Sequence, residues 1–211
     1  MAEAPRHFVF DFARVLFRWR PQVVIKTVLP ARAVDDASAE HWVAQIFQAY
    51  QGDWADYDRG TVQVPELVRR IAARTGLRAD EVQAVVDAVA PEMQPIAESV
   101  ALMQRLRRPG VPMFFLSNMP APVADHLERE NEFVRQFDQG VFSARVQRVK
   151  PEPAIFELCT QRFGVPASSL IFLDDHEPNV HAARAAGWQA ILFEDAAQCE
   201  RDIRQAGWWP A

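Results

Sequence analysis

The chain has 211 residues, of which 49% are hydrophobic and 24% charged, and its formal net charge is -5 at pH 7. This balance predicts a globular protein with one sizeable core, gives no sign of nucleic acid or an anionic membrane as a partner, and leaves no apolar run long enough to span a bilayer. The first ten residues lack the apolar stretch of a secretory signal, and two cysteines are too few for a disulfide framework, so we expect a cytoplasmic protein.

The first predicted element is a buried strand at 7–12, HFVFDF. From about residue 20 to residue 100, apolar residues recur at helical spacing, Gly76 fits a helix C-cap, and Pro91 and Pro95 are expected to break the last helix. This stretch carries no strong strand signal. It therefore predicts a helical module inserted after the first strand.

From residue 96 helices alternate with short apolar strands. Helices are predicted at 97–110, 123–133, 153–164 and 179–187, and strands at 112–118, 140–146, 170–175 and 189–195. Such alternation predicts a parallel sheet with helices on both faces. The expected fold class is α/β, with a Rossmann-like core at 1–18 and 97–211 and an inserted α-helical cap at 19–96.

Four polar clusters fall at or next to predicted strand ends, where parallel sheets bind their ligands. They are Asp11, Ser117 with Asn118, Lys150, and Asp174 with Asp175. The carboxylates suit a hard cation such as Mg²⁺, and the hydroxyl, backbone N–H and ammonium groups suit a phosphoryl group. Taken singly, each cluster has an ordinary explanation, such as a turn, a loop hydroxyl or a surface lysine.

Taken together, the clusters and their order resemble the haloacid dehalogenase-like hydrolase superfamily, in its branch with a helical cap after the first core strand. The matching segments are FVFDFARVL, FFLSNMP, VKPEPAIFE and IFLDDHEPNVHAARAAG, and the cap segment GDWADYDRGTV also resembles a stretch common in this branch. These segments span the chain from about residue 7 to residue 195. One such segment is a weak signal, but four in the right order are specific.

The resemblance implies roles in phosphoryl transfer. Asp11 would be the nucleophile that takes the phosphoryl group as an aspartyl phosphate, which divides one difficult step into two. Ser117 and the backbone N–H of Asn118 would hold phosphoryl oxygens, and Lys150 would offset the negative charge. Arg14, next to this anionic site, is a further candidate for substrate binding.

The resemblance also implies a metal site. Mg²⁺ would be held by Asp174 and Asp175 together with Asp11 and the backbone carbonyl of Ala13. Asn179 stands where the branch often has an asparagine that braces the adjoining loop.

The chain departs from the superfamily pattern at Ala13. Most phosphatases of this superfamily have a second Asp there, as a general acid and base of the kind that typically contributes ~10²–10⁴-fold in rate. Alanine transfers no proton, and the guanidinium of Arg14 stays protonated. Either another group acts, or the substrate has a good leaving group, or the site binds a phosphorylated ligand with little turnover. The candidates for another group are Asp53, Asp56, Asp58 and His176.

We therefore predict a Mg²⁺-dependent phosphohydrolase of small phosphorylated metabolites, sugar phosphates before nucleotides or proteins, with no nucleic-acid or membrane partner. The cap is large enough to close over a small ligand. A catalytically weak or inactive relative that serves as a binding module is the main alternative. 2-Haloacid dehalogenation is a weaker alternative, because that reaction needs no Mg²⁺. The dehalogenase pattern at the nucleophile also resembles Asp-x-Tyr, whereas this chain has Asp11-Phe12-Ala13. The oligomeric state is not predicted.

Overall fold

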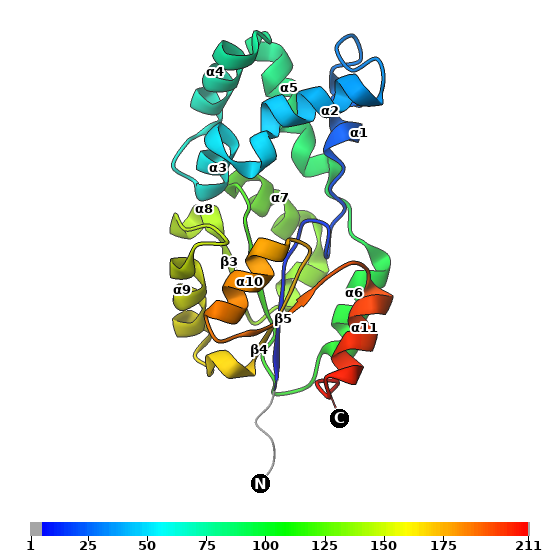
Figure 1. Cartoon of the computed structure of the whole chain (residues 1–211), viewed down its shortest axis with the longest axis vertical. Helices are drawn as coiled ribbons and strands as arrows, with labels where there is room; N and C mark the ends of the chain where they lie inside the picture. Colours follow the sequence, from blue (N-terminus) through cyan, green and yellow to red (C-terminus); the bar gives the residue numbers. More distant parts are fainter. Residues whose placement is uncertain (1–5, 211) are drawn as a thin grey trace.

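A five-stranded parallel sheet lies at the centre of the lower half of the molecule in Figure 1, in a computed structural model that describes residues 6–210. Its spatial order is β3-β2-β1-β4-β5. The strands are β1 (His7–Phe10), β2 (Phe114–Ser117), β3 (Gln139–Phe142), β4 (Leu170–Asp174) and β5 (Gln189–Leu192). The order runs outward from β1 in both directions, so the loops after β1, β2 and β4 meet at one edge of the sheet. Residues 1–5 and 211, the ends of the expected core ranges, lie outside the described part of the chain.

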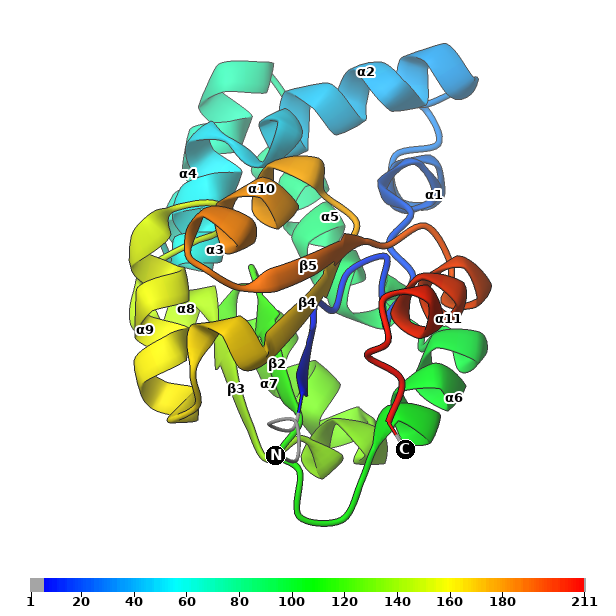
Figure 2. The same ribbon diagram turned by 60° about the horizontal axis from the view of Figure 1, so that its bottom comes forward.

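Helices cover both faces of the sheet, as the alternating pattern predicts (Figure 2). Because successive strand residues point to opposite faces, Phe8 and Phe10 pack in one apolar cluster and Val9 in the other. The first cluster is covered by α6 (Ala97–Leu106), α7 (Ala121–Glu130) and α11 (Ala196–Gln205). The second is covered by α9 (Pro153–Phe163) and α10 (Glu177–Ala185). The Rossmann-like α/β core is confirmed.

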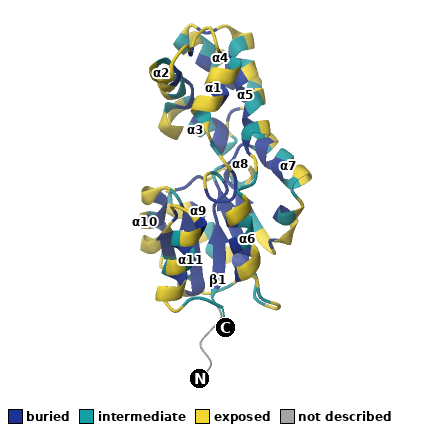
Figure 3. Cartoon of the chain, turned by 90° about the vertical axis from the view of Figure 1, so that its right-hand side faces the viewer, coloured by how far each residue is buried: buried dark blue, intermediate teal, exposed yellow. Residues whose placement is uncertain are grey.

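The helices that follow β1 and precede α6 form a separate body above the carboxyl ends of the strands (Figure 1). They are α1 (Pro21–Val28), α2 (Asp36–Phe47), the 3₁₀ turn η1 (Gln48–Tyr50), α3 (Gly52–Arg59), α4 (Val64–Thr75) and α5 (Ala79–Glu92). Their inner faces are buried and their outer faces exposed (Figure 3). We call this body the cap; its bounds at 19–96 stay a prediction.

Two local expectations were wrong. Helix α5 continues through Pro91 to Glu92, because Pro91 lies in the last turn, where little helix follows for a kink to displace. The strand expected at 140–146 ends at Phe142, where the short helix α8 (Ser143–Val146) begins. This early end matters for the site, because it turns the side chain of Ser143 toward the cap and the loop after β2.

The remaining elements are the 3₁₀ turns η2 (Glu132–Gln136) and η3 (Ala167–Ser169). Within residues 6–210, no helix has the length and apolar character needed to cross a membrane.

Candidate active site

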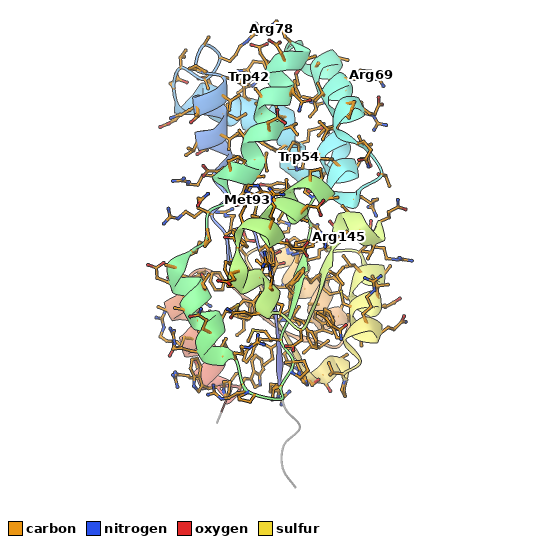
Figure 4. All side chains as sticks on the ribbon, turned by 180° about the vertical axis from the view of Figure 1, so that it is seen from behind. Trp42, Trp54, Arg69, Arg78, Met93 and Arg145 are labelled. Carbon is orange, nitrogen blue, oxygen red and sulfur yellow. The ribbon has the colours of Figure 1, made fainter. Side chains whose placement is uncertain are left out.

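A cleft of about 390 Å³ lies where the cap meets the carboxyl edge of the sheet. The core side contributes polar groups to its wall, which include Asp11, Asn118, Lys150, Asp175 and His176. The cap side contributes mostly large apolar and aromatic groups, which include Trp19, Tyr50, Trp54, Val89 and Met93, together with one acid, Asp58. Figure 4 labels Trp54 and Met93, which lie at the level where the cap meets the core helices. The cleft thus has one polar and one largely apolar wall.

Lys150 joins two buried carboxylates on the polar wall. Its Nζ lies 2.9 Å from Oδ1 of Asp11 and 2.6 Å from Oδ2 of Asp174. It also donates to the backbone carbonyl of Leu116 at 3.2 Å. Asp11, Lys150 and Asp174 are 6%, 4% and 0% exposed. Because buried charges are tolerated only in pairs, this lysine is the group that lets two carboxylates stand side by side here.

The loop after β2 positions Lys150 through Asn118. The Asn118 side chain donates to the Lys150 carbonyl at 2.9 Å and accepts from the Lys150 N–H at 2.8 Å. The resemblance assigns a role only to the Asn118 backbone N–H, so this reciprocal pair is a contact that reasoning from the sequence missed. No local signal could reveal it, because the partners are 32 residues apart.

Asp174 is held by several donors besides Lys150. Its Oδ1 accepts from the backbone N–H of His176 at 2.8 Å and from Nδ2 of Asn179 at 3.0 Å, and its Oδ2 lies 3.1 Å from the same amide nitrogen. Asn179 stands in the first turn of α10, so the start of this helix fixes the end of β4. This contact is consistent with the bracing role that the resemblance implies.

Three carboxylates form a cluster suited to a cation. Asp11, Asp174 and Asp175 each offer an oxygen within 4.8 Å of the others. The pKa of Asp11 is raised to about 7, mainly by burial; Lys150 opposes this rise, and Asp174 and Asp175 contribute to it. Burial, and then the charge of Asp174, also raises the pKa of Asp175. A set of hard oxygen donors that repel one another fits Mg²⁺, which would relieve that repulsion.

The other predicted site residues lie at the same edge. Ser117 is fully buried at the end of β2, and its Oγ has no hydrogen-bond partner among the residues that the structure describes. Ala13 and Arg14 line the cleft. Arg14 has a left-handed backbone (φ 63°), and its Nε lies 3.5 Å from Oδ2 of Asp175. An orphaned buried hydroxyl and a nearby guanidinium fit an anionic ligand.

The three acids of cap helix α3 differ in their surroundings. Asp53 pairs with Arg74 and Asp56 with Arg70, each at 3.1 Å, and the Asp56 side chain is 46% exposed. Asp58 is buried and lines the cleft. His176 lines it too, from the loop after β4. Among the candidates for the missing general acid, the structure thus places Asp58 and His176 at the cleft. It pairs Asp53 and Asp56 with arginines instead.

Comparison with known proteins also matches this chain to hydrolases. A family model described as haloacid dehalogenase-like hydrolase matches residues 5–187. A sesquiterpene phosphatase, AstK, of Aspergillus oryzae is 25% identical over 93% of this chain and 94% of its own length. An (S)-2-haloacid dehalogenase of Pseudomonas putida is 23% identical over 67% of this chain and 61% of its own.

Among solved structures, a HAD family enzyme of Bacteroides thetaiotaomicron was crystallised with magnesium and inorganic phosphate. Its structure matches with a TM-score of 0.73 at 19% identity, covering 93% of this chain and 99% of that one. This likeness concerns the fold.

Proposed function

Because the chain belongs to the haloacid dehalogenase-like hydrolase family, we propose that it is a Mg²⁺-dependent phosphatase of small phosphorylated metabolites. The observation that carries the proposal is the polar wall of the cleft, where Lys150 lies between Asp11 and Asp174. A phosphatase among its relatives, and a structural neighbour crystallised with magnesium and phosphate, support it.

In this proposal the polar wall binds the phosphoryl group and attacks it. Asp11 attacks phosphorus and takes the phosphoryl group as an aspartyl phosphate. Ser117 Oγ and the Asn118 N–H hold phosphoryl oxygens, with Lys150 and Arg14 as positive partners. Mg²⁺, when bound by the neighbouring carboxylates, would supply positive charge that stabilises the phosphoryl group.

The residues proposed to hold Mg²⁺ are the cluster of three carboxylates, Asp11, Asp174 and Asp175, and the backbone carbonyl of Ala13. The mutual proximity of the three carboxylate oxygens supports this set.

The apolar wall bears on the substrate. Trp19 and Trp54 bring two indoles to the cleft, and Trp19 Nε1 donates to the Tyr50 hydroxyl at 2.5 Å, which orients both rings. Aromatic faces pack against the apolar face of a sugar ring, which supports the sugar phosphates expected from the sequence. They pack equally against a hydrocarbon chain, so isoprenoid phosphates are the second candidate, favoured by the sesquiterpene phosphatase relative.

Two other functions remain as alternatives. A binding module without turnover has no need of a nucleophile. In this chain the expected nucleophile, Asp11, is present, and the buried ammonium of Lys150 lies 2.9 Å from it. Halide release is the second alternative, because one relative is named as a 2-haloacid dehalogenase. Dehalogenation does not require a metal, whereas the cluster of three carboxylates supports a metal site, so we favour the phosphatase.

The test is release of phosphate from sugar phosphates, isoprenoid phosphates and acetyl phosphate, with and without Mg²⁺, by wild type and Asp11→Asn. We expect Mg²⁺-dependent release that the variant lacks. Chloride release from 2-chloropropionate, or no release at all above the variant's background, would contradict the proposal. The cytoplasmic location stays a prediction, which fractionation of the source cells tests.

A further inference from the structure

The proposed phosphatase needs a proton donor that its nucleophile loop does not supply. When an unactivated phosphate ester is cleaved, the departing oxygen requires a proton, and Ala13 has none to give. Attacking and leaving oxygens lie roughly in line on opposite sides of phosphorus. Since Asp11 attacks from the core side of the cleft, the leaving oxygen faces the cap side. The missing donor should therefore be sought on the cap wall.

Asp58 is the acid on that wall. It lies in α3, lines the cleft and is only 6% exposed. Asp53 and Asp56, on the same helix, are held by Arg74 and Arg70, whereas no salt bridge within residues 6–210 neutralises Asp58. A buried carboxyl group without a paired cation is costly to keep charged. Both the position of Asp58 in the cleft and its burial without a cation therefore suit a group that carries a proton.

Three consecutive residues dock this part of α3 onto the core (Figure 1). The Asp58 carbonyl accepts from Ser143 Oγ at 2.5 Å. Arg59 forms a bidentate pair with Glu152, at 2.9 and 2.5 Å. Gly60 has φ +79° and lies so close to α8 that an added Cβ would be 2.4 Å from the carbonyl oxygen of Ala144. The backbone that carries Asp58 is thus fixed by the core.

The same serine ties Asp58 to the phosphate-binding loop. Ser143 Oγ donates to the Asp58 carbonyl and accepts from the backbone N–H of Met119 at 2.8 Å. Met119 directly follows Ser117 and Asn118, which are proposed to hold phosphoryl oxygens. One buried hydroxyl therefore sets the register between the cap acid and the phosphoryl site, as a general acid requires.

Burial favours the neutral form of Asp58, and it outweighs the opposing charge of Lys150. Burial raises the pKa of Asp58 to about 8, while the charge of Lys150 and a contact with the Trp54 indole lower it. The other titratable groups that it faces are Tyr50 and Tyr57, whose pKa values are raised mainly by burial and also by Asp58. Asp58 therefore carries its proton at neutral pH, while Lys150 is paired with Asp11 and Asp174.

From this placement we propose that Asp58 is the general acid and base of the proposed phosphatase, in place of the acid missing at Ala13. In the first step Asp11 forms a bond to phosphorus, the bond from phosphorus to the ester oxygen breaks, and the Asp58 proton passes to that oxygen. The products are the alcohol, the aspartyl phosphate and the Asp58 carboxylate. In the second step this carboxylate takes a proton from water, whose oxygen attacks phosphorus. Inorganic phosphate leaves, Asp11 is freed and Asp58 is protonated again.

The test compares two kinds of ester in Asp58→Asn. Nitrophenolate leaves without a proton, so kcat/KM for p-nitrophenyl phosphate should stay within about tenfold of wild type. For the alkyl or sugar phosphate that wild type cleaves best, kcat/KM should fall ~10²–10⁴-fold. Because water activation is also impaired, mixing with p-nitrophenyl phosphate should give a burst of one nitrophenolate per protein before slow turnover. Asp56→Asn, on the same helix but exposed, is the matched control and should behave as wild type.

Wild type supplies a second measurement that needs no variant. Its kcat/KM for alkyl phosphates should decline above about pH 8, where Asp58 loses its proton, and kcat/KM for p-nitrophenyl phosphate should show no such decline. Equal losses for both esters in Asp58→Asn, or equal pH profiles in wild type, would overturn the role of Asp58 and leave the phosphatase standing. Wild type that cleaves no ester at all would overturn both.

Discussion

Two buried carboxyl groups line one cleft, Asp11 from the core and Asp58 from the cap, and their neighbouring groups differ. Asp11 has the Lys150 ammonium 2.9 Å away and two further carboxylates within cation-binding distance. Asp58 has neither, and burial raises its pKa to about 8. Burial also raises the pKa of Asp11, to about 7, but only Asp11 has a paired cation and further carboxylates beside it. The first environment suits a group that binds and attacks, and the second suits a group that holds a proton and gives it up.

This difference comes from the scaffold around each acid. Asp11 stands at the end of the central strand, where three loops converge and bring charged groups from distant parts of the chain. Asp58 stands on a helix whose neighbours in the cleft are aromatic. Different roles for two buried acids therefore need no special residue, only a charged wall and an apolar wall that face each other.

The largest expected effect comes from removing the cation on the charged wall. Lys150→Met leaves Asp11 and Asp174 buried without a paired cation, and breaking such a cluster costs about 3–5 kcal/mol of unfolding free energy. Urea denaturation at pH 7.5 measures this. The chain's other lysine gives the control: Lys26 is 42% exposed and pairs with Asp36 at the surface, so Lys26→Met should cost less than about 1 kcal/mol. Equal losses of unfolding free energy in the two variants would show that Lys150 does not stabilise the buried carboxylates.

The second expected effect separates the two walls by metal binding. A Mg²⁺ concentration 100 times the dissociation constant should stabilise wild type by about 2.7 kcal/mol, seen as a rise in Tm. The rise should vanish in Asp175→Asn, which loses a member of the carboxylate cluster, and persist in Asp58→Asn. A loss of the rise in Asp58→Asn would place the metal elsewhere.

The third effect is the pH dependence of stability on the cap side. Burial raises the pKa of Asp58 from 3.8 to about 8, so the folded protein holds this proton more tightly than the unfolded chain. The stability that Asp58 contributes is full below about pH 4 and is lost as the pH rises toward 8.

Asp58→Asn removes this dependence. Relative to its difference from wild type at pH 4, the variant should gain at least about 1–2 kcal/mol at pH 8, where thermal unfolding checks it. Asp56→Asn should show no comparable gain. A constant difference between wild type and Asp58→Asn across this range would mean that Asp58 is charged when folded.

The smallest effect concerns the docking of α3. Arg59→Gln removes the pair with Glu152, which is partly exposed, and should cost less than about 1 kcal/mol of stability. Because that pair holds the backbone next to Asp58, kcat/KM for alkyl phosphates should fall about 3–10-fold, with little change for p-nitrophenyl phosphate. Arg70→Gln, which breaks pairs within the cap alone, is the control. A drop of the same size in both variants would point to general loosening of the cap.

Much of the core could be predicted because its signals are local. Strands buried on both faces read as continuous apolar runs, as in LIFLD, and the helices between them keep their own period. The polar residues that end these strands converge because parallel strands share one carboxyl edge. Thus the sequence predicted which residues gather, although it offered no means of seeing the reciprocal pair of Asn118 with the Lys150 backbone.

The cap was predicted only as a helical region. Asp53, Asp56 and Asp58 share one short helix and one chemistry, and they differ in the direction in which they project from it. That direction has meaning only once α3 is docked, and the docking contacts come from Ser143, Ala144 and Glu152. Ser143 itself was expected within a strand, so the contact that fixes Asp58 was hidden as well.

By itself, the sequence determined the parallel sheet and the residues at its carboxyl edge, because apolar periodicity and strand-end polarity are written in consecutive residues. Only the tertiary structure decided which acid of cap helix α3 lines the cleft together with Asp11. The reason is physical: the burial of Asp58 exists only once the cap is packed on the core, and the hydrogen bond that fixes its backbone comes from Ser143, 85 positions away along the chain.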